Sequence, residues 1–203
     1  MMECYILAGG QSKRFGEDKL LFKIGSLKVI EYVLKAASEV CPSVYIVTKN
    51  RRKFEDLKVP VIEDLLPDQT PLVGLYTALK HTQEDKILLL GADIPLIKPE
   101  VLQLLFEKFE EPITLFSING KLQPLVGIYS KALYPIVEEH LKIGKRSFLS
   151  LLRSLRYKVL KENTLREVDP ELCSLINMNT KEDLRLILKK MEEMHGSKTY
   201  SED

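Results

Sequence analysis

The sequence predicts an α/β protein in which a mostly parallel β-sheet, extended by antiparallel strands, is covered by helices to give three layers. In the first half of the chain, short apolar runs alternate with longer segments of helical period, which is typical of such a fold. The turn signal Asn119-Gly120 then separates two β-like segments and predicts the antiparallel extension. The chain has 203 residues and no linker rich in Pro or Gly, so we expect one domain over residues 1–195.

The predicted strands are short, apolar and mostly bounded by Gly, Pro or polar residues, as buried parallel strands are. They cover residues 4–7, 44–47, 59–62, 87–90 and 113–116. The segments 113–118 and 122–129 are expected to pair around the Asn119-Gly120 turn, and 157–160 is expected to form a last strand.

The predicted helices keep one apolar face, because hydrophobic residues recur every three or four positions. They cover residues 29–37, 72–79, 101–109, 132–141, 148–155 and 181–194. Pro99 marks the start of the third helix, and Thr180 with Asp183 forms a capping-box pattern before the last one. Residues 196–203 are small and polar, so we expect a disordered tail.

Composition and charge exclude several classes of protein. The chain has 30 basic and 29 acidic residues, so its net charge of +1 creates no overall field that favours nucleic acid or anionic membrane. No apolar run approaches the ~20 residues of a membrane-spanning helix. The cysteines Cys4, Cys41 and Cys173 lack the spacing of a disulfide framework or zinc site, and the N-terminus lacks a signal-peptide pattern. We therefore expect a cytoplasmic protein that holds any anionic ligand in a local site.

The most informative segment reads LAGGQSKRFGEDK over residues 7–19, between the first strand and the first long helix. In an open α/β sheet, ligands bind at this edge. The adjacent Gly9 and Gly10 let backbone amides form a nest around phosphate oxygens, and Arg14 and Lys19 add positive charge. The spacing matches neither GxxxxGK(S/T) nor GxGxxG, which disfavours a P-loop NTPase and an ordinary dinucleotide site. The residues alone leave open a flexible glycine turn whose cations are solvated.

Two carboxylates follow predicted strands at the same edge of the sheet. Asp93 comes shortly after the strand at 87–90, and Asp64 follows the strand at 59–62. A hard oxygen ligand at Asp93 suits Mg²⁺ that bridges phosphates. An Asp that only caps the turn, or the helix near Pro99, is an equally good interpretation from the residues alone.

The motif LAGGxSxRxGxDK at the end of a first strand resembles the signature of the molybdenum cofactor guanylyltransferases, within the broader nucleotidyltransferase family. The likeness continues in order along almost the whole chain. It includes IED (62–64), TPLVG (70–74, similar to GPLxG), GADIP (91–95, similar to CDxP), QPLVGIY (123–129, similar to HPLxGLY), GKRS (144–147, similar to GxRS) and INMNTKEDL (176–184, similar to NxNTPEDL). This resemblance implies the single-domain, Rossmann-like, three-layer nucleotidyltransferase fold.

The resemblance also implies roles for individual residues. The nucleotide would be bound by Leu7, Ala8, Gly9, Gly10, Ser12, Arg14, Lys19, Thr48, Asp64, Gly74 and Asp93. Arg14, Lys19 and Asp93 would be catalytic, and Asp93 would hold the cofactor Mg²⁺. The acceptor would be bound by Gly127, Arg146, Asn177 and Asn179. The chain departs from the family pattern at Thr70 (usually Gly), at Gln123 (usually His) and at Thr48, where some relatives have Asn.

The implied reaction is attack by the terminal phosphate of molybdopterin on the α-phosphorus of GTP, which releases pyrophosphate and forms the guanine dinucleotide cofactor. GTP and molybdopterin are the implied partners, with transient contacts to proteins that deliver molybdopterin or mature molybdoenzymes. A cytidylyltransferase or sugar-phosphate nucleotidyltransferase is an alternative, because the glycine loop and Asp93 would serve any base. A nucleotide-sensing binding module without turnover is a second alternative. Asp18 before Lys19 and the pair Asn177/Asn179 favour the guanylyltransferase.

Other polar residues are interpreted as structural. The three histidines, His81, His140 and His195, fall on helix faces or ends without a Ser or Cys partner in any nucleophile motif, so we expect them at the surface or at helix ends. The run of basic residues at 49–53 could guide an anionic substrate, but a solvated loop is the preferred interpretation.

Overall fold

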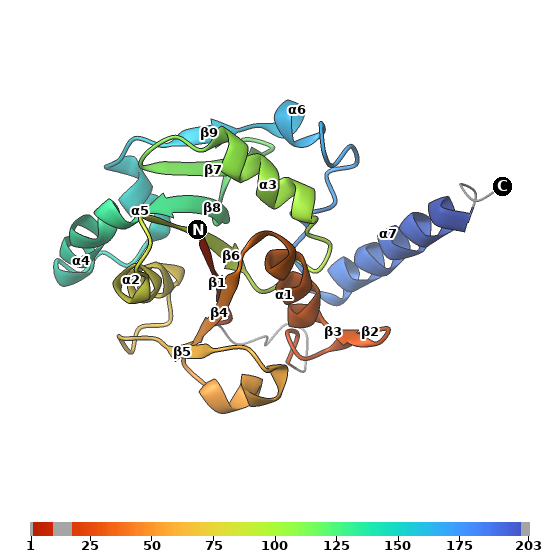
Figure 1. Ribbon diagram of the computed structural model, residues 1–203, viewed down its shortest axis with the longest axis horizontal. Coiled ribbons are helices and arrows are strands. Elements are labelled where there is room, and N and C mark those ends of the chain that lie inside the picture. The colour runs from red at the N-terminus through yellow and green to blue at the C-terminus, as the bar shows by residue number, and fades with distance from the viewer. Residues whose placement is uncertain (1, 10–17, 200–203) are drawn as a thin grey trace.

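The computed structural model describes residues 2–9 and 18–199 (Figure 1). In this part of the chain, seven strands form one sheet in the order β5-β4-β1-β6-β8-β7-β9. Their bounds are β1 Glu3–Leu7, β4 Ser43–Thr48, β5 Val61–Glu63, β6 Lys86–Gly91, β7 Ile113–Ile118, β8 Lys121–Ser130 and β9 Lys158–Leu160. β8 is antiparallel to β6 and β7, whereas the other pairs of this sheet are parallel. The predicted mostly parallel sheet with an antiparallel extension is confirmed.

Helices cover both faces of this sheet. They include α1 Val29–Val40, α2 Pro71–His81, α3 Pro99–Lys108, α4 Tyr134–Lys142 and α5 Phe148–Arg153. Helices α1 and α3 pack on one face, and α2, α4 and α5 pack on the other (Figure 1). Side chains alternate between the faces of a strand, so Cys4 and Ile6 of β1 join the core under α1, whereas Tyr5 joins the core under α2. The predicted three layers are confirmed.

The apolar residues whose spacing predicts α2 form the face that this helix buries against the sheet. Leu72, Leu75 and Leu79 are fully buried against the sheet. Burial of each such side chain contributes about 1.5–3 kcal/mol. The helix is therefore stabilised mainly by packing, and its first turn is held at the carboxyl edge of the sheet.

The structure adds short elements that periodicity does not indicate. β2 (Lys23–Ile24) and β3 (Leu27–Lys28) form a separate hairpin, and α6 (Glu162–Leu165) is a single turn. Residues Arg51–Leu57 form the 3₁₀-helix η1, which is anchored by the buried Phe54. The basic run at 49–53 is therefore not a simple solvated loop. Elements of two to seven residues are too short to show a full hydrophobic period.

Several boundaries differ from the prediction, and two of these differences have a clear physical cause. β5 begins at Val61 instead of residue 59, since Pro60 has no amide proton to donate to a neighbouring strand. The last helix, α7, spans Lys181–Thr199 and projects away from the body (Figure 1), so residues 196–199 of the predicted tail are helical. Gly196 lowers helix propensity by only about 1 kcal/mol, and no Pro follows to end the helix. Residues 200–203 lie outside the described residues.

The capping box predicted before α7 is confirmed. The Asp183 amide donates to Thr180 Oγ1 at 3.1 Å, and Asp183 Oδ2 accepts from the Thr180 amide at 2.9 Å. The same carboxylate oxygen also accepts from the Asn179 amide at 2.9 Å. The helix start therefore fixes the backbone of the segment that carries Asn179.

One histidine is not a surface residue. His140 is only 7% exposed, and its Nε2 lies 3.1 Å from Ser150 Oγ, which links α4 to α5. His140 therefore occupies the helix end and not the surface: it lies in the last turn of α4, and α5 covers that side of the helix. The ring of His81, by contrast, lies at the exposed end of α2 against Tyr5 and Tyr45.

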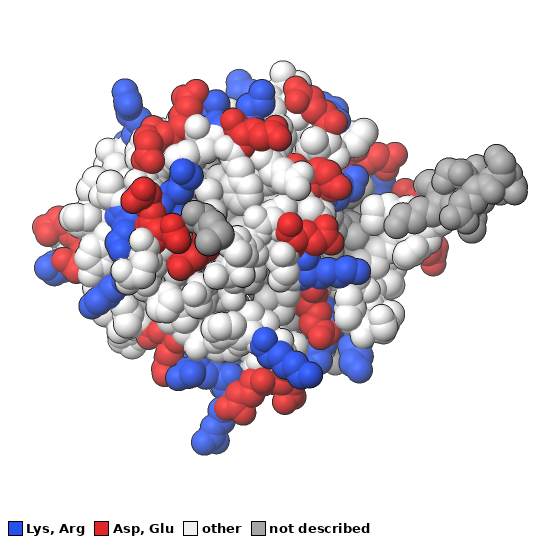
Figure 2. All heavy atoms as spheres, in the orientation of Figure 1, with Lys and Arg blue, Asp and Glu red and all other residues white. Residues whose placement is uncertain are grey.

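Charged side chains are mixed over the face drawn in Figure 2, where Lys and Arg alternate with Asp and Glu around an uncharged centre. This distribution fits the net charge of +1 and leaves binding of an anion to local geometry. Within the described ranges, no helix combines the length and the apolar character that crossing a membrane requires.

Candidate functional site

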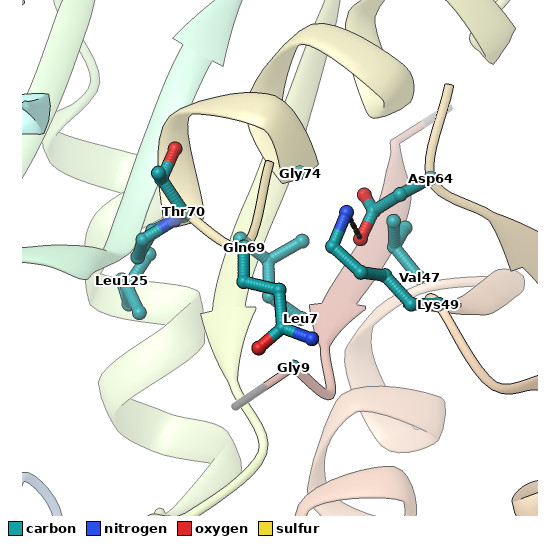
Figure 3. A pocket seen from close by; sticks show the side chains of 10 residues that line it. Leu7, Gly9, Val47, Lys49, Asp64, Gln69, Thr70, Gly74 and Leu125 are labelled. Atoms are coloured by element: carbon teal, nitrogen blue, oxygen red, sulfur yellow. Dashed lines mark ion pairs between the residues drawn. The ribbon is translucent and has the colours of Figure 1, made fainter. Parts of the chain in front are cut away.

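The carboxyl ends of β1, β4, β5 and β6 lie at one edge of the sheet, where a cavity of about 170 Å³ opens (Figure 3). The neighbours of β1 are β4 on one side and β6 on the other, and ligands bind in open α/β sheets at such a point. Leu7 and Gly9 come from the end of β1, and Asp64 follows β5. Thr70, which begins α2, and Leu125 of β8 line the opposite side.

The start of α2 sets the width of this cavity. Thr70 Oγ1 accepts from the Val73 amide at 3.4 Å, and Pro71 occupies the first turn, where no amide proton is needed. Gly74 then lies against the end of β1: a Cβ atom there would be 2.7 Å from Leu7 Cδ1. A side chain at Gly74 would therefore push Leu7 out of its place in the cavity wall.

Asp64 and Lys49 form a charged pair in the wall of this cavity (Figure 3). Asp64 Oδ2 lies 3.8 Å from Lys49 Nζ, and Asp64 Oδ1 lies 3.5 Å from Thr77 Oγ1. Burial raises the pKa of the Asp64 carboxyl group, whereas the Lys49 charge and the Thr77 hydrogen bond oppose that rise. The Asp64 amide donates to the Thr48 carbonyl at 2.9 Å, so the pairing of β4 with β5 holds the carboxylate in position.

Lys19, Asp93 and Asn179 form a second polar group at the same edge. Lys19 Nζ lies 3.0 Å from Asp93 Oδ2 and donates to Asn179 Oδ1 at 2.6 Å. The Met178 amide donates to the Asp93 carbonyl at 2.7 Å. Segments from the two ends of the chain are thus joined at the loop after β6.

A second cavity of about 190 Å³ adjoins the first, and both are lined by Pro71 and Leu125. Its polar lining includes Asn177 and Gln123, and Phe148 contributes an aromatic wall. The edge of the sheet therefore offers two neighbouring spaces. One space has a partly buried charged pair, and the other combines amide groups with apolar side chains.

The oxygen atoms around Asp93 fit a magnesium ion that is shared with a bound phosphate. The described residues contain no cluster of three or more His, Cys, Asp or Glu that could hold a metal by itself. Mg²⁺ is commonly bound by one or two carboxylates together with substrate phosphates. Here the Asp93 carboxylate and the Asn179 amide oxygen already converge on one cation, the Lys19 ammonium group. Hard oxygen donors in this arrangement suit Mg²⁺.

Comparisons with known proteins agree with this geometry. Residues 4–159 match the family described as MobA-like NTP transferase domain. A protein of Aquifex aeolicus named probable molybdenum cofactor guanylyltransferase is 46% identical over 186 residues, which cover 91% of this chain and 89% of that protein. The chain belongs to the molybdenum cofactor guanylyltransferase family. A Pyrococcus furiosus protein of the same name is 35% identical to this guanylyltransferase. That alignment covers 93% of this chain and 97% of the Pyrococcus protein.

A solved structure shows the same fold in this guanylyltransferase family. The crystal structure of molybdopterin-guanine dinucleotide biosynthesis protein A from Archaeoglobus fulgidus is 28% identical, with a TM-score of 0.80. The match covers 97% of this chain and 100% of that one. The family resemblance and the nucleotidyltransferase fold inferred from the sequence motifs are confirmed.

Most of the predicted nucleotide-binding residues that the structure describes lie at this edge of the guanylyltransferase fold. Those that line the first cavity are Leu7, Gly9, Asp64 and Gly74. Ala8 is buried beside them, and its amide donates to the Val47 carbonyl at 2.9 Å. Thr48 is buried and does not line the cavity, because its Oγ1 turns to accept from the Asn50 amide. The predicted residues Gly10, Ser12 and Arg14 lie outside the described residues.

The predicted acceptor residues separate into two groups. Asn177 lines the second cavity, and Asn179 contacts Lys19. Gly127 lines neither cavity: it lies in the middle of β8, where a Cβ atom would be 3.0 Å from the Thr114 carbonyl oxygen. Glycine is therefore needed at position 127 because the neighbouring strand β7 leaves little space for a side chain. Arg146 Nε lies 3.3 Å from Asp68 Oδ2, so it ties the α4–α5 loop to the loop before α2.

Sequence reasoning did not assign several residues that line the cavities, among them the polar residues Lys49, Gln69 and Gln123. Lys49 follows β4 directly, so its place after a parallel strand was a usable signal, but the neighbouring basic residues favoured a solvated loop. Gln123 was noted only as a departure from the family motif. Gln123 and Asn177 both line the second cavity, and Gln123 is carried there by β8, which runs antiparallel to β6.

Proposed function

We propose that this chain transfers GMP from GTP to the terminal phosphate of molybdopterin, with release of pyrophosphate and formation of the molybdopterin guanine dinucleotide. The observation that carries this proposal is the pair of adjoining cavities at the carboxyl edge, next to Lys19 and Asp93. The first cavity has the charged pair and backbone that suit a nucleoside, and the second has the amides and aromatic wall that suit a planar heterocycle. The relatives' names support the same substrates.

The chemistry needs positioning more than it needs a general base. A phosphate monoester is largely ionised near neutral pH, so the acceptor is already a nucleophile. The enzyme must bring two anions together and neutralise charge on the pyrophosphate that leaves. The Lys19 ammonium group can make this charge-assisted contact from its place beside Asp93.

Asp93 would hold Mg²⁺, with Asn179 Oδ1 nearby. When bound, the ion supplies positive charge to phosphate oxygens. The Asp93 side chain is 22% exposed, so it is accessible from solvent and yet held by the loop after β6. Lys19 would exchange its contact with Asp93 for contacts with the nucleotide phosphates.

The second cavity would take the pterin. Amide side chains both donate and accept hydrogen bonds, so Asn177 and Gln123 can match the nitrogen and oxygen atoms of a pterin edge. Phe148 and Leu175 supply the apolar surface against which a flat ring packs. We further propose that the protein works in the cytoplasm and makes transient contacts with proteins that deliver molybdopterin or mature molybdoenzymes.

Turnover with each nucleotide tests the proposal. Pyrophosphate release is measured with molybdopterin, Mg²⁺ and GTP, CTP, ATP or UTP in separate reactions. We expect release with GTP and formation of the guanine dinucleotide. A preference for CTP would favour a cytidylyltransferase, release only with a sugar phosphate as acceptor would favour the sugar-phosphate class, and binding without release from any nucleotide would favour a sensing module.

Asn177→Ala is expected to raise KM for molybdopterin about tenfold, because the variant loses one hydrogen bond to the acceptor. The Kd for GTP should stay unchanged, since Asn177 lines only the second cavity of the two.

Asn179→Ala is expected to raise KM for molybdopterin and also to weaken GTP binding, because Asn179 Oδ1 accepts from Lys19. Steady-state kinetics and nucleotide calorimetry measure the two effects.

Asn163→Ala, on the exposed side of α6, is the matched control. It should alter neither constant. If Asn177→Ala lowers the melting temperature and leaves both constants unaltered, Asn177 only orders the turn before α7.

A further inference from the structure

We propose that Lys49 selects the base of the bound nucleotide by donating a hydrogen bond from its ammonium group to O6 of guanine. This inference rests on the proposed function, because guanine is the base of GTP. It concerns a residue that the family motifs do not include. Three observations carry it: the place of Lys49 along the sheet edge, its contacts, and the chemistry of its neighbour Asp64.

The place of Lys49 is at the far end of the site from the phosphates. Lys49 follows β4 and Asp64 follows β5, whereas Asp93 follows β6, and these strands lie in the order β5-β4-β1-β6. Adjacent strands are about 4.8 Å apart, so the ends of β5 and β6 are separated by roughly 14 Å. With the phosphates at Lys19 and Asp93, the ribose and base extend along this edge toward β4 and β5. The base then lies against the Lys49 side of the first cavity.

The contacts of Lys49 hold its ammonium group at the cavity and leave donors for a ligand. Its Nζ donates to the Leu66 carbonyl at 2.7 Å, and its side chain is 24% exposed. An ammonium group has three protons, and this carbonyl uses one. The distance of 3.8 Å to Asp64 Oδ2 is an ion-pair distance and longer than a hydrogen bond. Figure 3 shows the two charged groups facing each other on one side of the cavity.

The carboxylate oxygens of Asp64, next to the Lys49 ammonium group, can still accept hydrogen bonds from a ligand. Its side chain is 9% exposed, and the Thr77 hydroxyl group at 3.5 Å donates more closely to the Val73 carbonyl at 2.9 Å. A buried carboxylate with such long contacts is unfavourable until a donor reaches it. The cavity therefore presents a fixed donor, Lys49, next to a fixed acceptor, Asp64.

The Lys49 donor and the Asp64 acceptor complement the hydrogen-bonding edge of guanine but not that of adenine. Guanine has the acceptor O6 next to the donor N1–H, so the ammonium group and the carboxylate can both be satisfied. Adenine has the donor N6–H₂ where guanine has O6. An ammonium group cannot accept a hydrogen bond, so adenine would place its N6–H₂ donor against the Lys49 donor and offer no acceptor for the remaining ammonium protons.

Equilibrium binding to nucleotides that differ at O6 tests the inference without turnover. The protein variants are wild type, Lys49→Met and the control Lys35→Met, which changes an exposed lysine of α1. The ligands are GTP, ATP, CTP and 2-aminopurine riboside triphosphate, which lacks both O6 and the N1 proton of guanine but keeps the 2-amino group. Melting curves accompany each titration. Lys49→Gln, which keeps an amide donor for the Leu66 carbonyl, replaces Lys49→Met if that variant does not fold.

We expect wild type to bind GTP more tightly than the 2-aminopurine analogue. Lys49→Met should weaken GTP binding about 10- to 100-fold and change binding of the analogue less than twofold, because the analogue already lacks the O6 contact that the variant removes. Lys35→Met should behave as wild type. An equal loss for GTP and the analogue, or no loss for either, would overturn the role of Lys49. Tighter binding of CTP than of GTP by wild type would instead overturn the proposed function, and this inference with it.

Discussion

Asp93→Asn is expected to lower turnover about 10²- to 10³-fold while the fold is kept. The amide has nearly the same shape as the carboxylate but lacks the negative charge that suits Mg²⁺ and that now faces the Lys19 ammonium group at 3.0 Å. The backbone contact of this residue, from the Met178 amide to the Asp93 carbonyl, does not depend on the side chain. The variant therefore separates charge from loop structure.

Initial rates over a range of Mg²⁺ concentrations, together with a melting curve, measure the effect. The Lys19–Asp93 pair is partly exposed, so its loss should cost about 1 kcal/mol or less, which corresponds to a melting temperature lower by about 4 °C at most. Asp85→Asn is the matched control, because Asp85 is exposed just before the amino end of β6, at the other end of the same strand. Wild-type turnover of Asp93→Asn at limiting Mg²⁺ would mean that Asp93 only caps the turn.

Lys19→Ala is expected to weaken GTP binding about 10- to 100-fold and to leave guanosine binding nearly unchanged. A lysine ammonium group acts as a point charge on phosphate oxygens, and a hydrogen bond to a charged group contributes about 1.5–3 kcal/mol. Lys19 is well placed for such a contact because its Nζ lies between Asp93 and Asn179, the residues assigned to the metal and the acceptor. In the proposed reaction, the substitution therefore removes a charge that both substrates would meet.

Calorimetry with GTP, GDP and guanosine measures this prediction, and the loss should shrink as phosphates are removed. Lys23→Ala changes an exposed lysine of the β2–β3 hairpin four residues later and should bind all three ligands as wild type does. Equal affinity for GTP in Lys19→Ala and wild type would place this side chain outside the phosphate site. An equal loss for guanosine would point to a disturbed cavity.

The sequence by itself predicted where the carboxylates lie relative to the sheet. Asp64 and Asp93 each follow an apolar strand, and the carboxyl ends of parallel strands share one edge. The structure confirms that Asp64 lines a cavity there and that Asp93 lies at the same edge with Lys19. This part was predictable because strand periodicity and the direction of parallel strands are set by short stretches of sequence.

The surroundings of individual side chains were decided by tertiary structure. His140 was expected at the surface or at a helix end, and it is buried at the end of α4 because α5 packs over it. Gly127 was expected near the acceptor, but residues of β7 fill the space beside it. Neither neighbour is visible in the local sequence. The same applies to Gln123, which reaches the second cavity through the antiparallel pairing of β8 with β6.

Sequence alone therefore determined the α/β class, the edge that carries the site, and the presence of Asp64, Asp93 and Lys19 at that edge. Only the tertiary structure decided that Lys49 lies at the cavity, because the Leu66 carbonyl and the Asp64 carboxylate that hold its ammonium group come from the loop after a different strand. It also decided that Lys19 meets Asn179, 160 residues later in the chain. The physical reason is that hydrophobic period and turn propensity act over a few residues, whereas the partner of a charged side chain is selected when distant segments pack together.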